Sequence, residues 1–160
     1  MTHHQTTANT VPPTPTSTGD THDVTNTPPV LHGYNAFDTD PALREALHRE
    51  NAGWAEGRAR QLGATVGDPD MQERARQANR HIPEFRPFDS YGNRVDIVEY
   101  HPAYHELMTA AMAAEVHSLA WSADKPGGHV ARAAMSYLWN QVENGVGCPT
   151  GMAYAAIPLL

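Results

Sequence analysis

The sequence predicts an all-α domain of about five helices, preceded by a disordered N-terminal arm. After Val30, apolar residues recur every three or four positions in several stretches, which is the period of a helix with one buried face. Three of these stretches open with a proline directly after a residue that can cap a helix. Residues 1–29 are mostly Thr, Pro, Asn and His, a composition typical of disordered segments. We therefore expect a tail over residues 1–29 and a helical domain over 30–160.

Composition and charge exclude several classes of protein. The formal net charge of -7 argues against a grip on nucleic acid by this chain, because phosphate contacts require a basic face. The single cysteine, Cys148, excludes an internal disulfide and favours a reducing compartment. No apolar run approaches the roughly 18 residues of a membrane span, and the tail lacks the apolar core of a signal peptide. These features predict a soluble, cytoplasmic protein.

The first expected helix begins at Asp40 and ends near Gly63. Asp40 can accept hydrogen bonds from free N–H groups, and Pro41 suits the first helical position because its missing N–H is not needed there. Gly53 and Gly57 weaken the middle of this helix. Its apolar stripe comprises Leu43, Leu47, Trp54 and Leu62.

The second expected helix repeats this start with Asp68 and Pro69, and Pro83 ends it. Its apolar side comprises Met71, Ala75 and Ala78. After a turn at "SYGN", Val95 and Ile97 alternate with polar residues, which predicts at most a short strand or an extended connection.

Three more helices complete the expected fold. Pro102 opens the strongest one, and His101 before it stands at a natural capping position. Its apolar stripe comprises Tyr104, Leu107, Met108, Ala111, Met112, Val116 and Leu119. The next helix is expected to end at a Gly145 cap, with Val130, Ala134, Tyr137, Leu138, Gln141 and Val142 on its inner side. The last is expected to begin near Pro149 and to be still helical at Leu160.

Three features are candidates for chemistry, and each has a simpler structural interpretation. His101 and His105 stand four residues apart beside Glu106, but no third metal ligand is evident. The glycine-rich "GVGCPTG" lacks the lysine and the spacing of phosphate-binding loops, so a helix end and a tight turn explain it better. Cys148 has no histidine placed beside it by the sequence, and a solvated tail accounts for His3, His4 and His22. The residues alone therefore assign no catalytic, cofactor-binding or metal-binding position.

Long stretches of the chain resemble a known family. The stretches "VEYHPAYHELM" and "QVENGVGCPTGMAYAAIPLL", with "GYNAFDTDPALREALHREN" upstream, are similar to the N-terminal part of AidB-type acyl-CoA dehydrogenases. These are flavoproteins associated with the adaptive response to DNA alkylation. The likeness covers residues 30–160 and leaves out the Thr- and Pro-rich tail.

The resemblance implies that the chain is one domain of a longer flavoprotein. Members of this family have an N-terminal helical domain, a middle β-domain and a C-terminal helical region, and they are expected to be homo-oligomers when complete. FAD, the catalytic glutamate base and the proposed DNA-contacting region belong mainly to the parts that would follow Leu160. We therefore expect this chain to bind no FAD and to be inactive alone. Its apolar ending, up to Leu160, would then be a loose final helix without its packing partner.

The resemblance also suggests which residues face the rest of the enzyme. Because ligands bind where domains meet, Cys148, Pro149, Thr150 and Met152 are expected to line the acyl or flavin cleft. The alternative for these residues is a plain core between domains. A different class of function also stays open, in which the chain is a stand-alone helical interaction or oligomerisation module that binds through its apolar end. A histidine-based metal hydrolase is a third hypothesis.

Overall fold

The computed structural model describes residues 25–31 and 33–160. The chain divides into two units, Met1–Leu31 and His32–Leu160, and all the described helices and strands belong to the second. The described residues of the first unit, 25–31, are exposed and form neither helix nor strand. His3, His4 and His22 lie outside the described residues.

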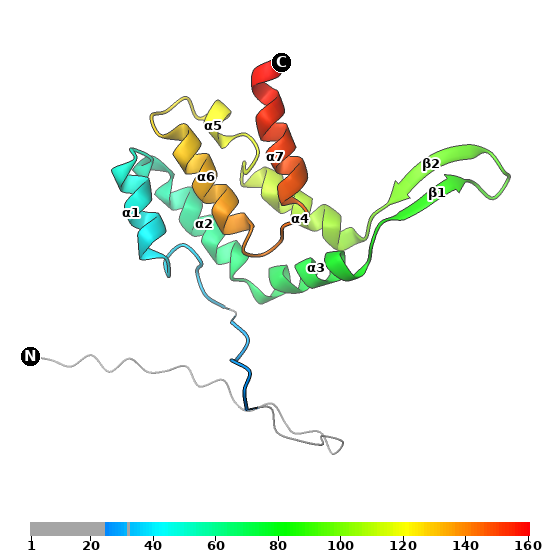
Figure 1. The fold of residues 1–160 in the computed structure, drawn as a ribbon, viewed down its shortest axis with the longest axis horizontal. Coiled ribbons are helices and arrows are strands. Elements are labelled where there is room, and N and C mark those ends of the chain that lie inside the picture. The colour runs from blue at the N-terminus through cyan, green and yellow to red at the C-terminus, as the bar shows by residue number, and fades with distance from the viewer. Residues whose placement is uncertain (1–24, 32) are drawn as a thin grey trace, which may run out of the picture. The chain divides into compact units, whose positions relative to one another are not determined.

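Helices and one hairpin make up the second unit (Figure 1). In chain order its elements are α1 (Pro41–Arg49), the 3-10 turn η1 (Gly53–Ala55), α2 (Glu56–Val66), α3 (Pro69–Arg80), β1 (Glu84–Phe88), β2 (Arg94–Glu99), α4 (Pro102–Ala113), α5 (Leu119–Ser122), α6 (Gly128–Trp139), α7 (Gly147–Ala156) and the 3-10 turn η2 (Ile157–Leu159). The all-α fold class is confirmed. Among the described residues, no helix has the length and apolar character needed to cross a membrane.

The described part of the chain has seven α-helices where about five were expected, because two of the expected helices are each divided. Asn51 takes a left-handed backbone conformation with φ of 59°, which separates α1 from α2. Glu115 does the same with φ of 55° between α4 and α5. Its carboxylate accepts a hydrogen bond from the Ser122 hydroxyl (2.9 Å) and pairs with Arg58 on α2. Contacts between elements therefore stabilise at least the break at Glu115. The local sequence does not reveal such contacts.

The three expected helix starts are confirmed. Asp40 Oδ1 accepts a hydrogen bond from the backbone N–H of Leu43 (2.9 Å), and Asp68 Oδ1 accepts one from Asp70 (2.8 Å). His101 caps α4 through Nδ1, which accepts from the N–H of Ala103 (3.2 Å). Each cap depends on residues within one helical turn, which is why the sequence predicts it.

Some expected helix ends are wrong. α2 continues past Gly63 to Val66, and α6 ends at Trp139 rather than at Gly145. The last α-helix, α7, stops at Ala156 and gives way to η2, so it is not still α-helical at Leu160.

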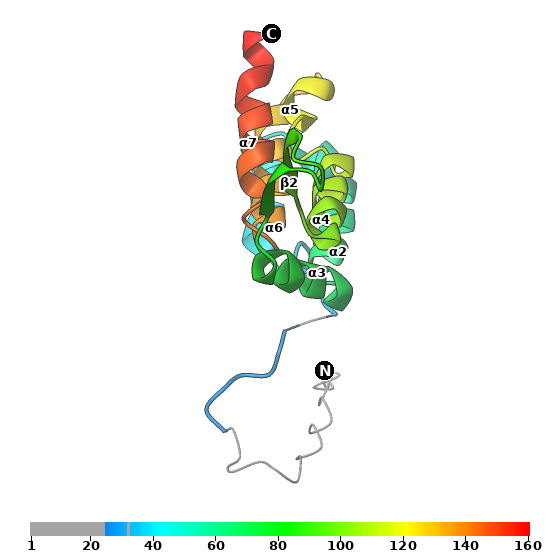
Figure 2. The same ribbon diagram turned by 90° about the vertical axis from the view of Figure 1, so that its right-hand side faces the viewer.

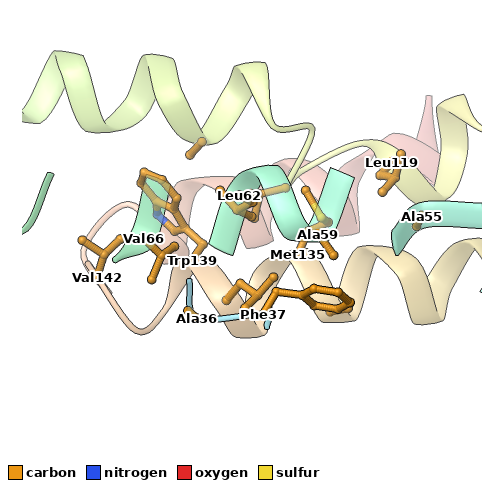
Figure 3. Close-up of a cluster of buried hydrophobic side chains, with 14 of the residues drawn as sticks. Ala36, Phe37, Ala55, Ala59, Leu62, Val66, Leu119, Met135, Trp139 and Val142 are labelled. Carbon is orange, nitrogen blue, oxygen red and sulfur yellow. The ribbon is translucent and has the colours of Figure 1, made fainter. Parts of the chain in front are cut away.

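The core lies around α6, which packs against α1, α2 and α5 (Figures 1 and 3). Trp139 is fully buried beside Val66 and Val142, and Phe37 closes the core from the segment that precedes α1 (Figure 3). The expected inner side of α6 is partly wrong, because Tyr137 and Gln141 are exposed. The Tyr137 hydroxyl instead donates a hydrogen bond to Asp40 Oδ2 on the surface (3.0 Å).

Strands β1 and β2 form an antiparallel hairpin that extends away from the helices (Figure 1). Figure 2 views this hairpin end-on in front of the helices. Phe85 pairs with Val98 across the hairpin, and Phe85 is 62% exposed. The sequence indicated at most one short strand here, so the second strand and their pairing are new findings.

The segment before α1 crosses α2 at a glycine. The Ala36 N–H donates to the Gly63 carbonyl (3.0 Å), and a methyl group at Gly63 would lie 2.6 Å from the backbone nitrogen of Phe37. Backbone atoms cannot retreat from such a contact without disturbing the core residue Phe37.

We predict that Gly63→Ala lowers the free energy of unfolding by about 2 kcal/mol, because the new methyl group forces this segment off α2. Gly57→Ala in the same helix is the matched control, since a methyl group there meets no atom within 4 Å. The control should be neutral or stabilise by up to about 1 kcal/mol through helix propensity. Urea unfolding followed by circular dichroism measures both, and an equal effect of the two substitutions would contradict the close approach.

Candidate functional site: the last helix and its apolar surface

The last helix has an uncharged, exposed side. From Gly147 to Leu160 the chain has no Asp, Glu, Lys, Arg or His. Five exposed residues recur at helical spacing along one side, and we call them the α7 surface: Cys148, Met152, Ala155, Ala156 and Leu159. Met152 is 68% and Leu159 85% exposed. Such a side is typical of a surface that packs against another structure.

The opposite side of α7 faces the domain. Thr150 is only 1% exposed, and its hydroxyl donates to the carbonyls of Val146 (2.9 Å) and Gly147 (3.1 Å). Tyr154 and Ile157, one and two turns further on, are half-buried. The helix is therefore amphipathic in burial, although both of its sides lack charge.

A buried carboxylate fixes the start of α7. Glu143 is 6% exposed, and its two oxygens accept hydrogen bonds from the backbone N–H groups of Gly145 (2.8 Å) and Val146 (2.6 Å). The Asn79 side chain, at the end of α3, donates a third hydrogen bond (3.3 Å). Glu143 therefore joins the α6–α7 turn to α3 and sets the direction in which α7 leaves the domain.

A cluster of aromatic and basic side chains holds the middle of α7. The Trp121 indole N–H donates to the carbonyl of Tyr154 (3.1 Å), and the two rings stack with centroids 5.5 Å apart. The Tyr154 hydroxyl lies 2.6 Å from His129 Nδ1, and the Arg132 guanidinium lies 4.0 Å above the Tyr154 ring. Burial lowers the pKa of the Arg132 guanidinium. These contacts tie α7 to α5 and α6 through one residue, Tyr154.

The four residues expected to line a cleft are divided between the two sides of α7. Cys148 and Met152 belong to the exposed α7 surface, and Pro149 is half-buried. Thr150 is buried within this domain, and its hydroxyl donates to the carbonyl of Val146. Cleft lining by Cys148 and Met152 stays a prediction.

The other candidates have structural partners. The His101 imidazole caps α4 and stacks on His81 with ring centroids 4.6 Å apart. Within the described ranges, no three His, Cys, Asp or Glu side chains come together as a metal site. The N–H groups of Gly145 and Val146 in the glycine-rich turn are taken by Glu143, so they are not free for a phosphate.

Glu143 is the residue that the sequence analysis missed. Glu143 bonds the N–H groups two and three residues further on, in the turn that precedes α7. Such local side chain–backbone hydrogen bonds within a turn are a signal that could have found it. Its bond to Asn79 spans 64 residues of sequence and has no such signal.

The described residues around α7 leave few polar groups free for a flavin. The two donor groups nearest the start of α7 are occupied by Glu143, the Thr150 hydroxyl by the helix carbonyls, and the α7 surface has no charged group for a pyrophosphate. What the arrangement offers is an exposed apolar surface on a helix that Glu143 and Tyr154 connect to the domain.

Comparison with known proteins identifies the family. Residues 26–160 match the model of the family described as "Adaptive response protein AidB N-terminal domain". The chain belongs to this family. The resemblance found in the sequence is thereby confirmed.

One curated relative is similar over most of this chain. The "Putative acyl-CoA dehydrogenase AidB" of Escherichia coli (strain K12) is 44% identical over 141 residues, which is 88% of this chain and 26% of the relative. The chain therefore spans about a quarter of the length of that relative.

Two solved structures share the fold. The Caenorhabditis elegans ACDH-11 structure in complex with C11-CoA matches with a TM-score of 0.74 at 23% identity, over 89% of this chain and 24% of that one. The structure titled "Bd2924 apo-form" matches with a TM-score of 0.62 at 24% identity, over 68% of this chain and 22% of that one. These similarities show that the AidB N-terminal domain has the helical arrangement of larger proteins.

We predict that Met152→Glu leaves the stability of this chain within about 0.5 kcal/mol of the original, because the side chain is exposed. Thr150→Glu, two residues away, should cost more than about 2 kcal/mol, because it buries a charge without a partner. Thermal unfolding of both variants tests which side of α7 faces the domain. Equal destabilisation by the two substitutions would contradict the assignment.

Proposed function

We propose that this chain is the N-terminal helical domain of an AidB-type acyl-CoA dehydrogenase, and that the α7 surface docks on the remainder of the enzyme. The observation that carries the proposal is this uncharged, exposed helix side in a domain that matches 26% of a longer relative. Burying it costs no desolvation of charge, and each large apolar side chain that becomes covered contributes about 1.5–3 kcal/mol.

The chain's contribution to the reaction is structural. In the complete enzyme, the chemistry is FAD-dependent oxidation of an acyl-CoA, with the flavin and the catalytic base supplied by segments outside these 160 residues. Glu143 and Tyr154 hold α7 in position, and Cys148 and Met152 present one wall of the acyl or flavin cleft. The chain alone is expected to bind no FAD and to be inactive.

Membership of this family supports a proposal for the cellular role. We propose that the complete protein acts in the response to DNA alkylation as a homo-oligomer, in a reducing cytoplasm that suits its free cysteine. With its net charge of -7, this domain is not the part that contacts DNA.

The proposal predicts that this domain can replace its counterpart in the relative. In a hybrid, residues of this chain substitute for the matching 141-residue segment of the Escherichia coli AidB. The hybrid should co-purify with FAD, whereas Met152→Glu in the hybrid should reduce the bound FAD at least about tenfold, because it places a charge in the buried contact.

Ala64→Glu, an exposed substitution on α2, is the matched control and should retain FAD. Flavin absorbance per protein measures all three proteins. Full FAD retention by the Met152→Glu hybrid would contradict docking through α7. Reduction of a flavin acceptor by the 160-residue chain with any acyl-CoA would contradict the assigned division of roles.

A stand-alone interaction or oligomerisation module is the second candidate, favoured by the same exposed α7 surface. It predicts self-association of the purified chain that Met152→Glu abolishes. Light scattering after size exclusion decides this point, and a monomer that binds no hydrophobic dye would count against the module.

A further inference from the structure

A small cavity lies where α3, the base of the hairpin, the start of α4 and the α6–α7 turn meet. Its volume is about 180 Å³, well above the roughly 15 Å³ that a single water needs. We call it the Glu143 cavity, and the residues used below are Asn79, His81, Tyr100, His101, Tyr104 and Glu143. None of its lining residues belongs to the α7 surface, so the docking proposal does not use this cavity.

The cavity contains a buried negative charge without a positive partner. Glu143 is 94% buried, and no described Lys, Arg or His side chain forms an ion pair with it. Its bonds from Gly145, Val146 and Asn79 occupy three of the roughly four acceptor positions of a carboxylate. One acceptor position is therefore left, and no described basic side chain neutralises the charge.

Aromatic rings line the cavity. Tyr100 stacks on Tyr104 with centroids 4.4 Å apart, and His81 stacks on His101 with centroids 4.6 Å apart. Burial raises the pKa of the Tyr104 hydroxyl, and the negative charges of Tyr100 and Glu143 raise it further. Faces of aromatic rings attract cations, and this wall is partly open to solvent, with Tyr100 40% exposed.

We propose that the Glu143 cavity binds an organic cation, an ammonium or guanidinium group, with Glu143 as its counter-charge and Tyr100 and Tyr104 as its aromatic wall. No lysine or arginine lines the cavity to compete for the carboxylate. An anionic ligand is rejected by the same buried charge. The cation is either a free small molecule or the side chain of an Arg or Lys from another segment of the enzyme.

The test is a titration of the 160-residue chain at about pH 8. Tetramethylammonium chloride and ethylguanidinium chloride are the probes, and sodium chloride at equal ionic strength is the control for screening. Imidazole carbon–proton NMR signals of His81 and His101 report on the cavity. Saturable shifts with either organic cation, absent with sodium chloride, are the expected result.

Variants localise the response. Glu143→Gln should weaken binding at least about tenfold, and its amide spectrum shows whether α7 stays folded. Tyr100→Leu keeps every bond of Glu143 and should weaken binding about threefold. Glu106→Gln removes an exposed carboxylate of α4 that lies outside the cavity, and it should bind like the original chain.

The hybrid with the Escherichia coli relative distinguishes a free small cation from an Arg or Lys side chain of the enzyme. If a basic side chain fills the cavity, the His81 and His101 signals are already displaced and no longer respond; if they still respond, the ligand is a free small cation. The absence of saturable shifts in the 160-residue chain, or equal shifts in the Tyr100→Leu variant, overturns the proposal.

Discussion

The position of α7 depends on the hydrogen bonds that the buried carboxylate of Glu143 accepts. Removing a charge from water costs several kcal/mol unless hydrogen bonds replace the lost hydration. Two backbone N–H groups and the Asn79 amide replace it here, and the carboxylate lies at the positive end of the α7 dipole. One side chain thus joins α3, the end of α6 and the start of α7.

The consequence is an apolar helix that is held on one side and exposed on the other. Tyr154 receives hydrogen bonds and ring contacts from three residues of α5 and α6, whereas Met152, two positions away, is left uncovered. Fixing a surface in place before docking lowers the entropy that docking costs. The proposed docking of this domain on the rest of a longer enzyme would use this exposed side of α7.

The sequence correctly predicted the structural features that depend only on residues close together in the chain. The caps at Asp40, Asp68 and His101 were confirmed because each acts within one turn of its own helix. The division of the third expected helix was not predictable, because the left-handed Glu115 is held by Arg58, which lies 57 residues away. The same contrast between local and long-range contacts applies to the candidate site. Family resemblance indicated the last helix, but burial, which separates Thr150 from Met152, depends on the packing of whole elements.

The most direct test of this account is the hydrogen bond between Glu143 and the turn. In the chain labelled with ¹⁵N and ¹³C, NMR can detect scalar coupling across a hydrogen bond, from the amide nitrogen of Val146 to the carboxyl carbon of Glu143. The account predicts a measurable coupling and slow hydrogen exchange of the Gly145 and Val146 amides. No coupling, with both amides exchanging as in an unfolded chain, would contradict it and leave the direction of α7 without a cause.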